Sequence, residues 1–289
     1  MSTCPITPPT ILPAVNRIIA IGDIHGDLEV FYRSLEIAKI AKKDQFGEFH
    51  WNANPPDTVV VQIGDMVDRG GREVTIGDEA SERHIFSLAD KLHKEALKFG
   101  GGFYCLLGNH EIMNVLGDFR YTTPMSRDDF GSSMDRLDAF KPGGPIARYF
   151  ACSRNVVMKI GDFIFVHGGL LPQHTKFSLE DINRIMRDYL LGNMSSQKYF
   201  DELYLREKGI LWSRELAGEK VDCSLLDKPF KTYQVKNMVI GHTVQTDGIN
   251  QTCDGKVWRI DIGASKGLGS VNSPQVLEIM HNSKVNILG

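Results

Sequence analysis

Residues 22–26 read Gly-Asp-Ile-His-Gly and residues 64–70 read Gly-Asp-Met-Val-Asp-Arg-Gly, each directly after a short apolar run rich in β-branched residues. Three further motifs follow apolar runs in the same way: Gly-Asn-His-Glu at 108–111, His-Gly-Gly at 167–169 and Gly-His-Thr at 241–243. The runs are too short for helices and too apolar for half-exposed strands, so they indicate buried strands. In each motif a glycine lets the backbone turn sharply, and a polar side chain stands at the carboxyl end of the strand.

The polar residues of these motifs are expected to meet in space. Open α/β sheets gather their ligand sites along the edge formed by the carboxyl ends of the strands. Six side chains would converge there: Asp23, His25, Asp65, Asn109, His167 and His242. Taken singly, each could serve only strand-end capping and turn formation. Their recurrence after five separate strands favours a shared functional site.

The chemistry of this set points to metal ions. A mixture of carboxylate or amide oxygens and imidazoles suits Mn²⁺, Fe or Zn²⁺ better than Ca²⁺ or Cu(I). Six protein ligands are too many for a single catalytic zinc, which takes three and a water. Two metals about 3.5–4 Å apart, bridged by one carboxylate, would use all six. Such a pair activates a bridging water and clamps a tetrahedral oxyanion, as the hydrolysis of a phosphate ester requires.

Three neighbouring residues fit that task. His110 can protonate the leaving oxygen if its side chain points away from the metals. Asp68, interpreted as lying one helical turn beyond Asp65, can face inward and hold that imidazole in its charged form. Arg69 offers a forked donor for phosphate oxygens.

The pattern between the strands predicts an α/β class. Helical periodicity recurs over 28–38, 85–96 and 182–189, with Ser178 as an N-cap. Alternating strands and helices indicate parallel pairing in the first half of the chain. Later apolar runs suit antiparallel hairpins (156–160, 163–166, 257–262 and 276–280), and polar connections are expected at 42–57, 117–146 and 266–274. No linker separates the motif strands, so we expect a single domain over 17–289 after an N-terminal extension of residues 1–16.

Composition narrows the possible partners. Of 289 residues, 42% are hydrophobic and 24% charged, which is typical of soluble globular proteins. The formal net charge of −3 gives no general attraction to nucleic acid or to an anionic membrane. No run approaches the ~18 uncharged apolar residues of a transmembrane helix. We therefore expect neither nucleic acid nor membrane as a partner.

The cysteines and the N-terminal residues indicate in which cellular compartment the protein is expected. Five cysteines form no C-x-x-C pair and are odd in number, which disfavours a disulfide framework and favours a reducing compartment. Residues 1–13 lack a basic segment followed by an apolar one, so no secretory signal is expected. The sequence thus predicts a soluble, intracellular, cytoplasmic protein. Cys105 is expected in the core, and the histidines outside the motifs at the surface or in loops: His50, His84, His93, His174 and His281.

The five motifs in this order resemble the phosphoprotein phosphatase family of dinuclear metallophosphatases. The text around them, at 108–123, 167–174, 241–250 and 253–267, is similar to the Shewanella-like protein phosphatases, a bacterial-type branch also found in plants and protists. The resemblance extends from residue 17 to about residue 276. It implies the calcineurin-like metallophosphatase fold, a central β-sandwich flanked by helices.

The resemblance also implies a role for each residue. Asp23, His25 and Asp65 would hold the first metal, and Asp65, Asn109, His167 and His242 the second. His110 would be the general acid, paired with Asp68. Arg69 and Asn109 would contact the substrate phosphate. Leu-Trp-Ser-Arg at 211–214 is similar to a segment of bacterial and phage members, which makes Arg214 the second arginine clamp.

The implied function is a metal-dependent phosphoprotein phosphatase that hydrolyses phosphate monoesters by in-line attack of a metal-bridging hydroxide. Its substrates would be phosphoproteins or phosphopeptides, and its cofactors two divalent cations, with Mn²⁺ expected and Fe or Zn²⁺ as alternatives. A diadenosine polyphosphate hydrolase, a nuclease and a non-catalytic phosphoprotein-binding scaffold are the competing hypotheses. The sequence does not discriminate phosphoserine and phosphothreonine from phosphotyrosine, and it does not indicate an oligomeric state.

Overall fold

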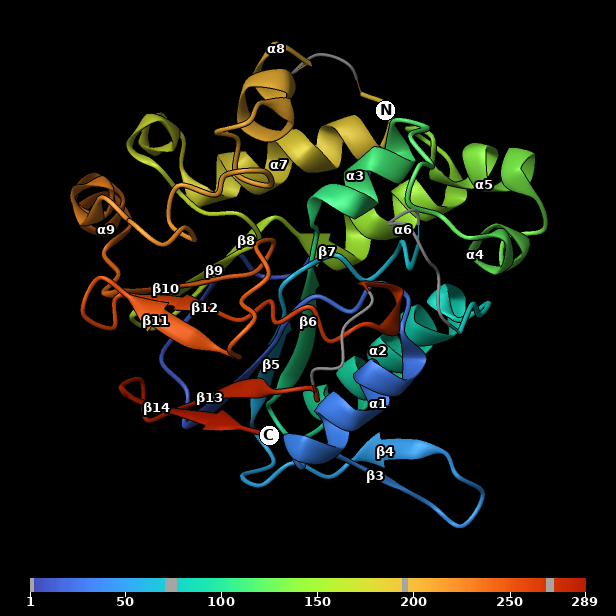
Figure 1. Ribbon diagram of the computed structural model, residues 1–289, viewed down its shortest axis with the longest axis horizontal. Helices are drawn as coiled ribbons and strands as arrows, with labels where there is room; N and C mark the ends of the chain where they lie inside the picture. Colours follow the sequence, from blue (N-terminus) through green and yellow to red (C-terminus); the bar gives the residue numbers. More distant parts are fainter. Residues whose placement is uncertain (1–2, 71–76, 194–196, 269–272) are drawn as a thin grey trace.

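The computed structural model describes residues 3–70, 77–193, 197–268 and 273–289. Its centre is formed by two six-stranded sheets that share one hydrophobic core (Figure 1). The first sheet has the order β14-β13-β2-β5-β6-β7, and β2, β5 and β6 run parallel as predicted. Its strands are β2 (Arg17–Ile21), β5 (Val59–Gln62), β6 (Gly102–Leu106), β7 (Arg154–Asn155), β13 (Val276–Met280) and β14 (Lys284–Leu288).

The second sheet has the order β1-β8-β9-β10-β12-β11. Its strands are β1 (Ile11–Leu12), β8 (Val157–Ile160), β9 (Phe163–Val166), β10 (Asn237–Ile240), β11 (Asn250–Thr252) and β12 (Val257–Arg259). The predicted hairpin of β8 and β9 is confirmed, whereas β9, β10 and β12 run parallel. The five motif strands are therefore divided between the two sheets, three in the first and two in the second.

Helices flank these sheets. In Figure 1, α1 (Leu28–Ile37) and α2 (Glu82–Leu97) lie side by side on one flank, and α2 packs against β6. The remaining α-helices are α3 (Asn109–Val115), α4 (Pro124–Asp128), α5 (Ser133–Phe140), α6 (Pro145–Ser153), α7 (Leu179–Leu190), α8 (Gln197–Phe200) and α9 (Asp227–Tyr233). Short 3₁₀ or π segments occupy Pro172–Lys176, Asp201–Leu205, Cys223–Leu226 and Lys266–Leu268. The predicted cap of α7 is present, since the Ser178 side chain accepts a hydrogen bond from the Asp181 amide.

Two of the predicted connections contain regular structure. Within 42–57, β4 (Phe49–Trp51) pairs with β3 (Ala41–Lys43) as a hairpin, because Phe49 and Trp51 turn their alternate side chains inward. Within 117–146, α4 and α5 begin at the capping side chains of Thr123 and Ser132, which were read as loop residues. In the third connection, residues 269–272 lie outside the described residues. The antiparallel hairpins expected for 257–262 and 276–280 are present in different sheets, since β12 pairs with β11 and β13 pairs with β14.

The prediction of a chain without disulfides is wrong. Cys4 is bonded to Cys152 and Cys223 to Cys253, with Cα–Cα separations of 5.2 and 5.6 Å. The pairs are 148 and 30 residues apart, so only the folded chain brings the sulfurs together. The reducing compartment that was inferred from cysteine spacing loses its support. Cys105 is the free cysteine, and its burial raises the pKa of the thiol to about 11, as expected for a core residue.

The segment predicted as an N-terminal extension contributes to the fold. Ile11 and Leu12 pair with β8, and the Asn155 side chain donates to the Pro9 carbonyl. Among the described residues, no helix combines the length and apolar character needed to cross a membrane.

Candidate metal centre and active site

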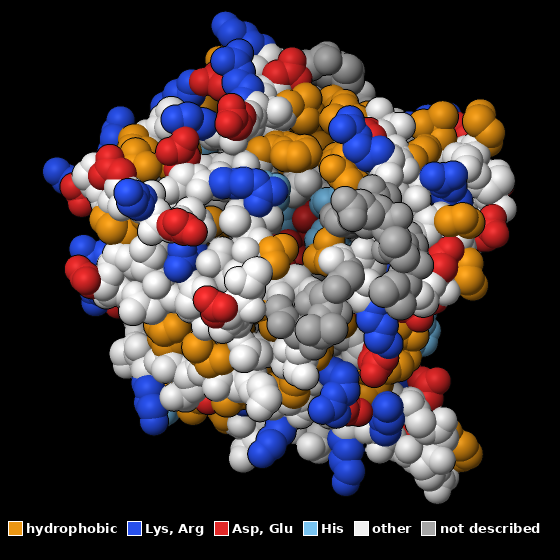
Figure 2. Space-filling model, viewed as in Figure 1, with side chains coloured by type: hydrophobic (Ala, Val, Ile, Leu, Met, Phe, Trp, Pro, Cys, Tyr) orange, Lys and Arg blue, Asp and Glu red, His pale blue; other side chains and the backbone are white. Residues whose placement is uncertain are grey.

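The loops after four of the five motif strands line one cavity of about 280 Å³, and His167, which follows the fifth, contacts the Asp65 side chain. Figure 2 shows the hollow on this face, with histidine and acidic side chains at its bottom. Its lining combines motif residues with residues from later loops: His25, Asp65, Asn109, His110, Tyr121, Trp212, Arg214, His242, Val244, Asp261 and Leu268. The prediction that separate strands deliver their polar side chains to one place is confirmed for these motif residues.

Several motif residues adopt backbone conformations that residues other than glycine rarely adopt. His25, Asp65, Asp68 and His242 have φ angles of 49°, 54°, 71° and 66°. Such left-handed conformations cost about 1–3 kcal/mol each and persist where the surroundings over-determine them. Here buried carboxylates hold the amides: Glu111 accepts from Asp65 N, Glu82 from Asp68 N, and Asp23 from His242 N, at 2.9, 2.9 and 3.1 Å. The strained loops therefore aim their side chains into the cavity.

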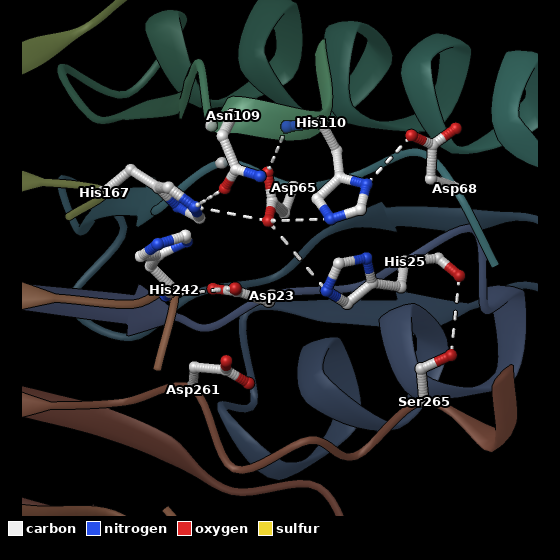
Figure 3. A network of polar contacts seen from close by, with 12 residues as sticks. Asp23, His25, Asp65, Asp68, Asn109, His110, His167, His242, Asp261 and Ser265 are labelled. Atoms are coloured by element: carbon white, nitrogen blue, oxygen red, sulfur yellow. Dashed lines mark hydrogen bonds and ion pairs between the residues drawn. The ribbon is translucent and has the colours of Figure 1, made fainter. Parts of the chain in front are cut away.

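The residues predicted to hold the second metal lie close together (Figure 3). Asp65 Oδ2 is 3.2 Å and Asn109 Oδ1 is 2.9 Å from His167 Nε2. Ligand atoms of Asp65, His167 and His242 all lie within 4.8 Å of one another. The pKa of His242 is lowered to about 3, by burial first and then by His167 and Arg214, so its imidazole is neutral and able to bind a metal.

Backbone carbonyls orient the three imidazoles of the predicted ligand set. His25 Nδ1 lies 3.3 Å from Val67 O, His167 Nδ1 lies 3.1 Å from Ile63 O, and His242 Nε2 lies 3.1 Å from Trp212 O. A carbonyl only accepts, so the nitrogen facing it carries the proton and the other nitrogen is left as an acceptor. The other nitrogen of His167, Nε2, lies next to the oxygens of Asp65 and Asn109. A nitrogen and two oxygens that converge in this way are favourably placed around a cation.

The residues predicted to hold the first metal also lie near one another, but the cluster of potential ligand atoms contains His110 in place of Asp23. His25 Nε2 is 3.9 Å from Asp65 Oδ2, and the second cluster of potential ligand atoms consists of His25, Asp65 and His110. Asp23 lies beside this cluster, 6% exposed, and its Oδ1 has no hydrogen-bond partner. Burial, then Asp261 and Asp65, raise the pKa of Asp23 well above its usual range.

Asp65 stands at the centre of both clusters. Burial alone would raise its pKa, but the imidazoles of His167 and His110 outweigh this effect and hold the pKa well below its usual range. A central ionised carboxylate with imidazoles on both sides is the arrangement that two divalent cations require. The residues present therefore fit a dinuclear centre, and the Asp23 oxygen without a hydrogen-bond partner can serve as an additional metal ligand.

His110 differs from the other imidazoles in its partner. Its Nδ1 lies 2.8 Å from Asp68 Oδ2, a carboxylate that favours the charged imidazolium. Asp68 is itself fixed, since the Asn114 amide donates to both of its oxygens at 2.9 Å. The fully buried Arg136 lies 3.5 Å from Asp68 and joins it to Glu82. The segment from Asp65 to Asp68 is an irregular loop and not the predicted helical turn, but the predicted contact is present.

A family model described as calcineurin-like phosphoesterase matches residues 16–246. The chain belongs to the calcineurin-like phosphoesterase family. The predicted fold of this family, with two central sheets flanked by helices, is confirmed.

Relatives of this calcineurin-like phosphoesterase come from several kingdoms. Shewanella-like protein phosphatase 2 of Arabidopsis thaliana is 34% identical over 319 residues, which cover 94% of this chain and 77% of that protein. Shewanella-like protein phosphatase 1 of Plasmodium berghei (strain Anka) is 31% identical over 259 residues, covering 86% of this chain and 67% of that protein. The crystal structure of a cold-active protein-tyrosine phosphatase from a psychrophilic Shewanella species superposes with a TM-score of 0.77. That superposition covers 98% of this chain and 83% of the other at 22% identity, and it shows the shared fold.

The two arginines predicted as phosphate clamps differ in this phosphoesterase. Arg214 lines the cavity, and its Nη1 donates to His242 O at 2.9 Å and to Thr243 Oγ1 at 2.8 Å. Arg69 is 2% exposed and does not line the cavity; its Nη1 contacts Asp27 and Glu79 at 3.1 and 2.8 Å. The structure brings Arg214 to the catalytic face and leaves Arg69 behind it. The role of Arg69 stays a prediction.

Several residues of the site were missed by the sequence reasoning. Glu111 is the last residue of the Gly-Asn-His-Glu motif, so the motif itself could have pointed to it. Glu82 and Arg136 come from helical segments without a motif. Asp261 lies in the cavity but follows β12 in a segment without a metal-binding motif. Among the histidines expected at the surface, His174 is 2% exposed and therefore an exception. The Leu171 amide donates to its Nδ1, and its Nε2 lies 3.0 Å from Lys208 O.

A larger cavity of about 670 Å³ adjoins the catalytic one. The two share Trp212 and Arg214, and the larger one is also lined by Glu207, Glu215 and Lys220. The catalytic pocket thus adjoins a second depression that presents both charged and apolar side chains.

Proposed function

We propose that this chain is a metal-dependent phosphoprotein phosphatase that hydrolyses phosphate monoesters directly with water. One observation carries the proposal: the carboxylate shared by two ligand clusters, Asp65, lies in the same cavity as an imidazole held by its own carboxylate. Two clusters of potential metal ligands alone would suit many hydrolases. His110 belongs to one of these clusters, but its contact with Asp68 suits it to donate a proton to a poor leaving group such as a serine alkoxide.

The side chains divide the reaction among them. Two divalent cations, when held by Asp23, His25, Asp65, Asn109, His167 and His242, would supply Lewis acidity and lower the pKa of bound water. Arg214 and Asn109 line the cavity, from which they can bind phosphoryl oxygens. His110 Nε2 faces this cavity and would donate its proton to the departing side-chain oxygen. Asp68 holds Nδ1 of the same ring and stabilises its charged form.

The reaction needs no phosphoenzyme. The described residues that line the cavity include no cysteine, serine or threonine to act as nucleophile. Water therefore attacks phosphorus in line with the leaving oxygen. In ¹⁸O-labelled water, we expect the label in the released phosphate and not in the side-chain oxygen of the product.

The relatives support protein substrates. Two of them bear the name Shewanella-like protein phosphatase, and the superposed Shewanella structure is described as a protein-tyrosine phosphatase. We therefore propose phosphoserine, phosphothreonine and phosphotyrosine side chains of proteins as the substrate class. We further propose Mn²⁺ as the activating cation and residues 17–289 as the catalytic domain. We also keep the predicted cytoplasmic location as a proposal, although two disulfides are more typical of an oxidising compartment.

A substrate panel tests the proposed function. The Mn²⁺-loaded protein is assayed for phosphate release from matched phosphoserine, phosphothreonine and phosphotyrosine peptides and from p-nitrophenyl phosphate. Turnover of diadenosine tetraphosphate is measured separately, by the nucleotides that it yields. Release from at least one phosphopeptide, abolished by EDTA and restored by Mn²⁺, is the expected result. Turnover of diadenosine tetraphosphate without any release from phosphopeptides would overturn the proposal.

A further inference from the structure

A carboxylate outside the predicted ligand set lies in the catalytic cavity. Asp261 follows β12, is 2% exposed and lines the cavity with His25, Asp65 and His242. Figure 3 shows its side chain on the side of the cavity where Asp23 and His242 lie. Neither the strand-end motifs nor the roles implied by the family assign this residue.

Backbone amides of two nearby loop residues fix the position of Asp261. Its carbonyl accepts from Gln245 N at 2.8 Å, and its Oδ1 accepts from Gly263 N at 2.9 Å. Gly263 has a φ of +61°, a conformation that glycine adopts without strain and that turns its amide back toward the carboxylate. The carboxylate therefore lies in the cavity because the loop holds it there.

The other neighbour of Asp261 is Asp23. Figure 3 shows both side chains on the same side of the cavity, and the negative charge of Asp261 helps to raise the pKa of Asp23. Asp23 uses Oδ2 to accept from His242 N, and its Oδ1 is buried without a hydrogen-bond partner. Gly241 makes room for this arrangement, since a Cβ there would come within 2.4 Å of Asp23 Oδ1.

Two buried carboxylates that face each other repel unless positive charge lies nearby. Among the described residues, neither Asp23 nor Asp261 forms an ion pair with lysine or arginine. The cavity that Asp261 lines also holds a further acid, Asp65, beside the imidazoles of His25 and His242. The arrangement is therefore unfavourable without a cation and favourable with one.

We propose that Asp261 is a positioning residue for the first metal site: it holds the Asp23 carboxylate toward the cation and adds negative charge on that side of the centre. This inference rests on the proposed function, because the metal site serves that reaction. Metal binding itself is measured without substrate. Residues that orient metal ligands typically change metal affinity 10–100-fold when they are replaced.

The test compares Asp261→Asn with the wild-type full chain in two states. Asparagine retains an oxygen to accept from Gly263 N, and its amide can donate to the unpartnered Asp23 oxygen. After treatment with EDTA, the variant should therefore unfold at the same or a higher temperature than the wild type. In the presence of Mn²⁺, isothermal titration should show a 10–100-fold weaker affinity at one of two sites. Asp247→Asn, which removes the same charge from an exposed loop, should change neither measurement.

The two readouts separate positioning from mere structural support. A residue that only stabilised the fold would lower the unfolding temperature of the metal-free protein when replaced. Asp261→Ala removes the carboxylate without adding a donor, and it should show the same loss of Mn²⁺ affinity. Wild-type affinity at both sites in either variant would overturn the inference. Two bound Mn²⁺ with no release of phosphate from any phosphopeptide would instead overturn the proposed function and leave the role of Asp261 intact.

Discussion

Replacing His110 by asparagine separates the two roles that the geometry offers this residue. Its Nδ1 is 2.8 Å from Asp68, and its Nε2 is 3.9 Å from the central carboxylate Asp65. As a general acid, Nε2 delivers a proton to the leaving oxygen. As a ligand, the same nitrogen would bind the first metal together with His25. Asparagine removes the titrating group and retains a polar side chain at the start of α3.

The size of the effect depends on the leaving group. General acid catalysis typically contributes ~10²–10⁴-fold, or about 3–5 kcal/mol of transition-state stabilisation. A serine alkoxide leaves poorly without a proton, so a phosphoserine peptide should lose this whole factor. The p-nitrophenolate anion leaves without a proton, so p-nitrophenyl phosphate should lose much less. Asp68→Asn removes a charge-assisted hydrogen bond worth about 1.5–3 kcal/mol, which predicts a milder loss of about 10–100-fold with the same substrate dependence.

The assay measures kcat/KM for both substrates and the Mn²⁺ content by elemental analysis. We expect His110→Asn to retain two Mn²⁺ and to depress turnover of the phosphoserine peptide at least ~10²-fold more than that of p-nitrophenyl phosphate. His281→Asn is the matched control, because residue 281 is exposed and has a φ of 51° that asparagine tolerates. Equal losses on both substrates, or loss of metal, would show that His110 is a ligand or a structural residue.

Four further changes test other parts of the structure. Asp65→Asn should abolish activity and release at least one equivalent of Mn²⁺ by elemental analysis, because this carboxylate belongs to both ligand clusters; full metal content would refute the bridging role. Arg214→Lys should lower kcat/KM about 10–100-fold without loss of metal, since an ammonium lacks the fork that binds two phosphoryl oxygens. Burial lowers the pKa of His174 to about 4. Between pH 6.5 and 4 its imidazole is therefore protonated in the unfolded chain but not in the folded one, and the free energy of unfolding decreases as the pH is lowered. Chemical denaturation should show this loss, up to about 3 kcal/mol, and His174→Gln should lack it. Replacing Cys223 and Cys253 by serine should lower the free energy of unfolding in urea by about 3–4 kcal/mol, and an unchanged value would refute the bond.

The metal-binding edge could be predicted from sequence because its determinants are local. Each motif combines an apolar run with a glycine and a polar residue, and the carboxyl ends of parallel strands meet at one edge. The division of the strands between two sheets does not alter this result. The loops after β2, β5 and β6 of the first sheet and after β10 of the second line the same cavity, and His167 after β9 contacts Asp65.

Other features depend on contacts between distant segments. Arg136 was read as part of a solvated segment, yet it is fully buried between Glu82 and Asp68, which lie 54 and 68 residues earlier. Arg69 follows Asp68 directly, yet Asp68 lies beside His110 while the guanidinium of Arg69 contacts Asp27 and Glu79. In both cases contacts with distant segments, and not the neighbours in sequence, decide where the side chain lies.

By itself, the sequence determined that buried strands end in metal-binding side chains, because glycine, apolar and polar residues act there through local geometry. Only the tertiary structure decided that Asp261 lines the cavity, that Cys4 meets Cys152 and that Arg136 is buried between Glu82 and Asp68. These contacts join residues far apart in the sequence: Cys4 and Cys152 are 148 positions apart, and Arg136 and Glu82 are 54 positions apart. A chain brings such residues together only by packing its sheets and helices around one core, and no pattern within a short stretch of sequence specifies that packing.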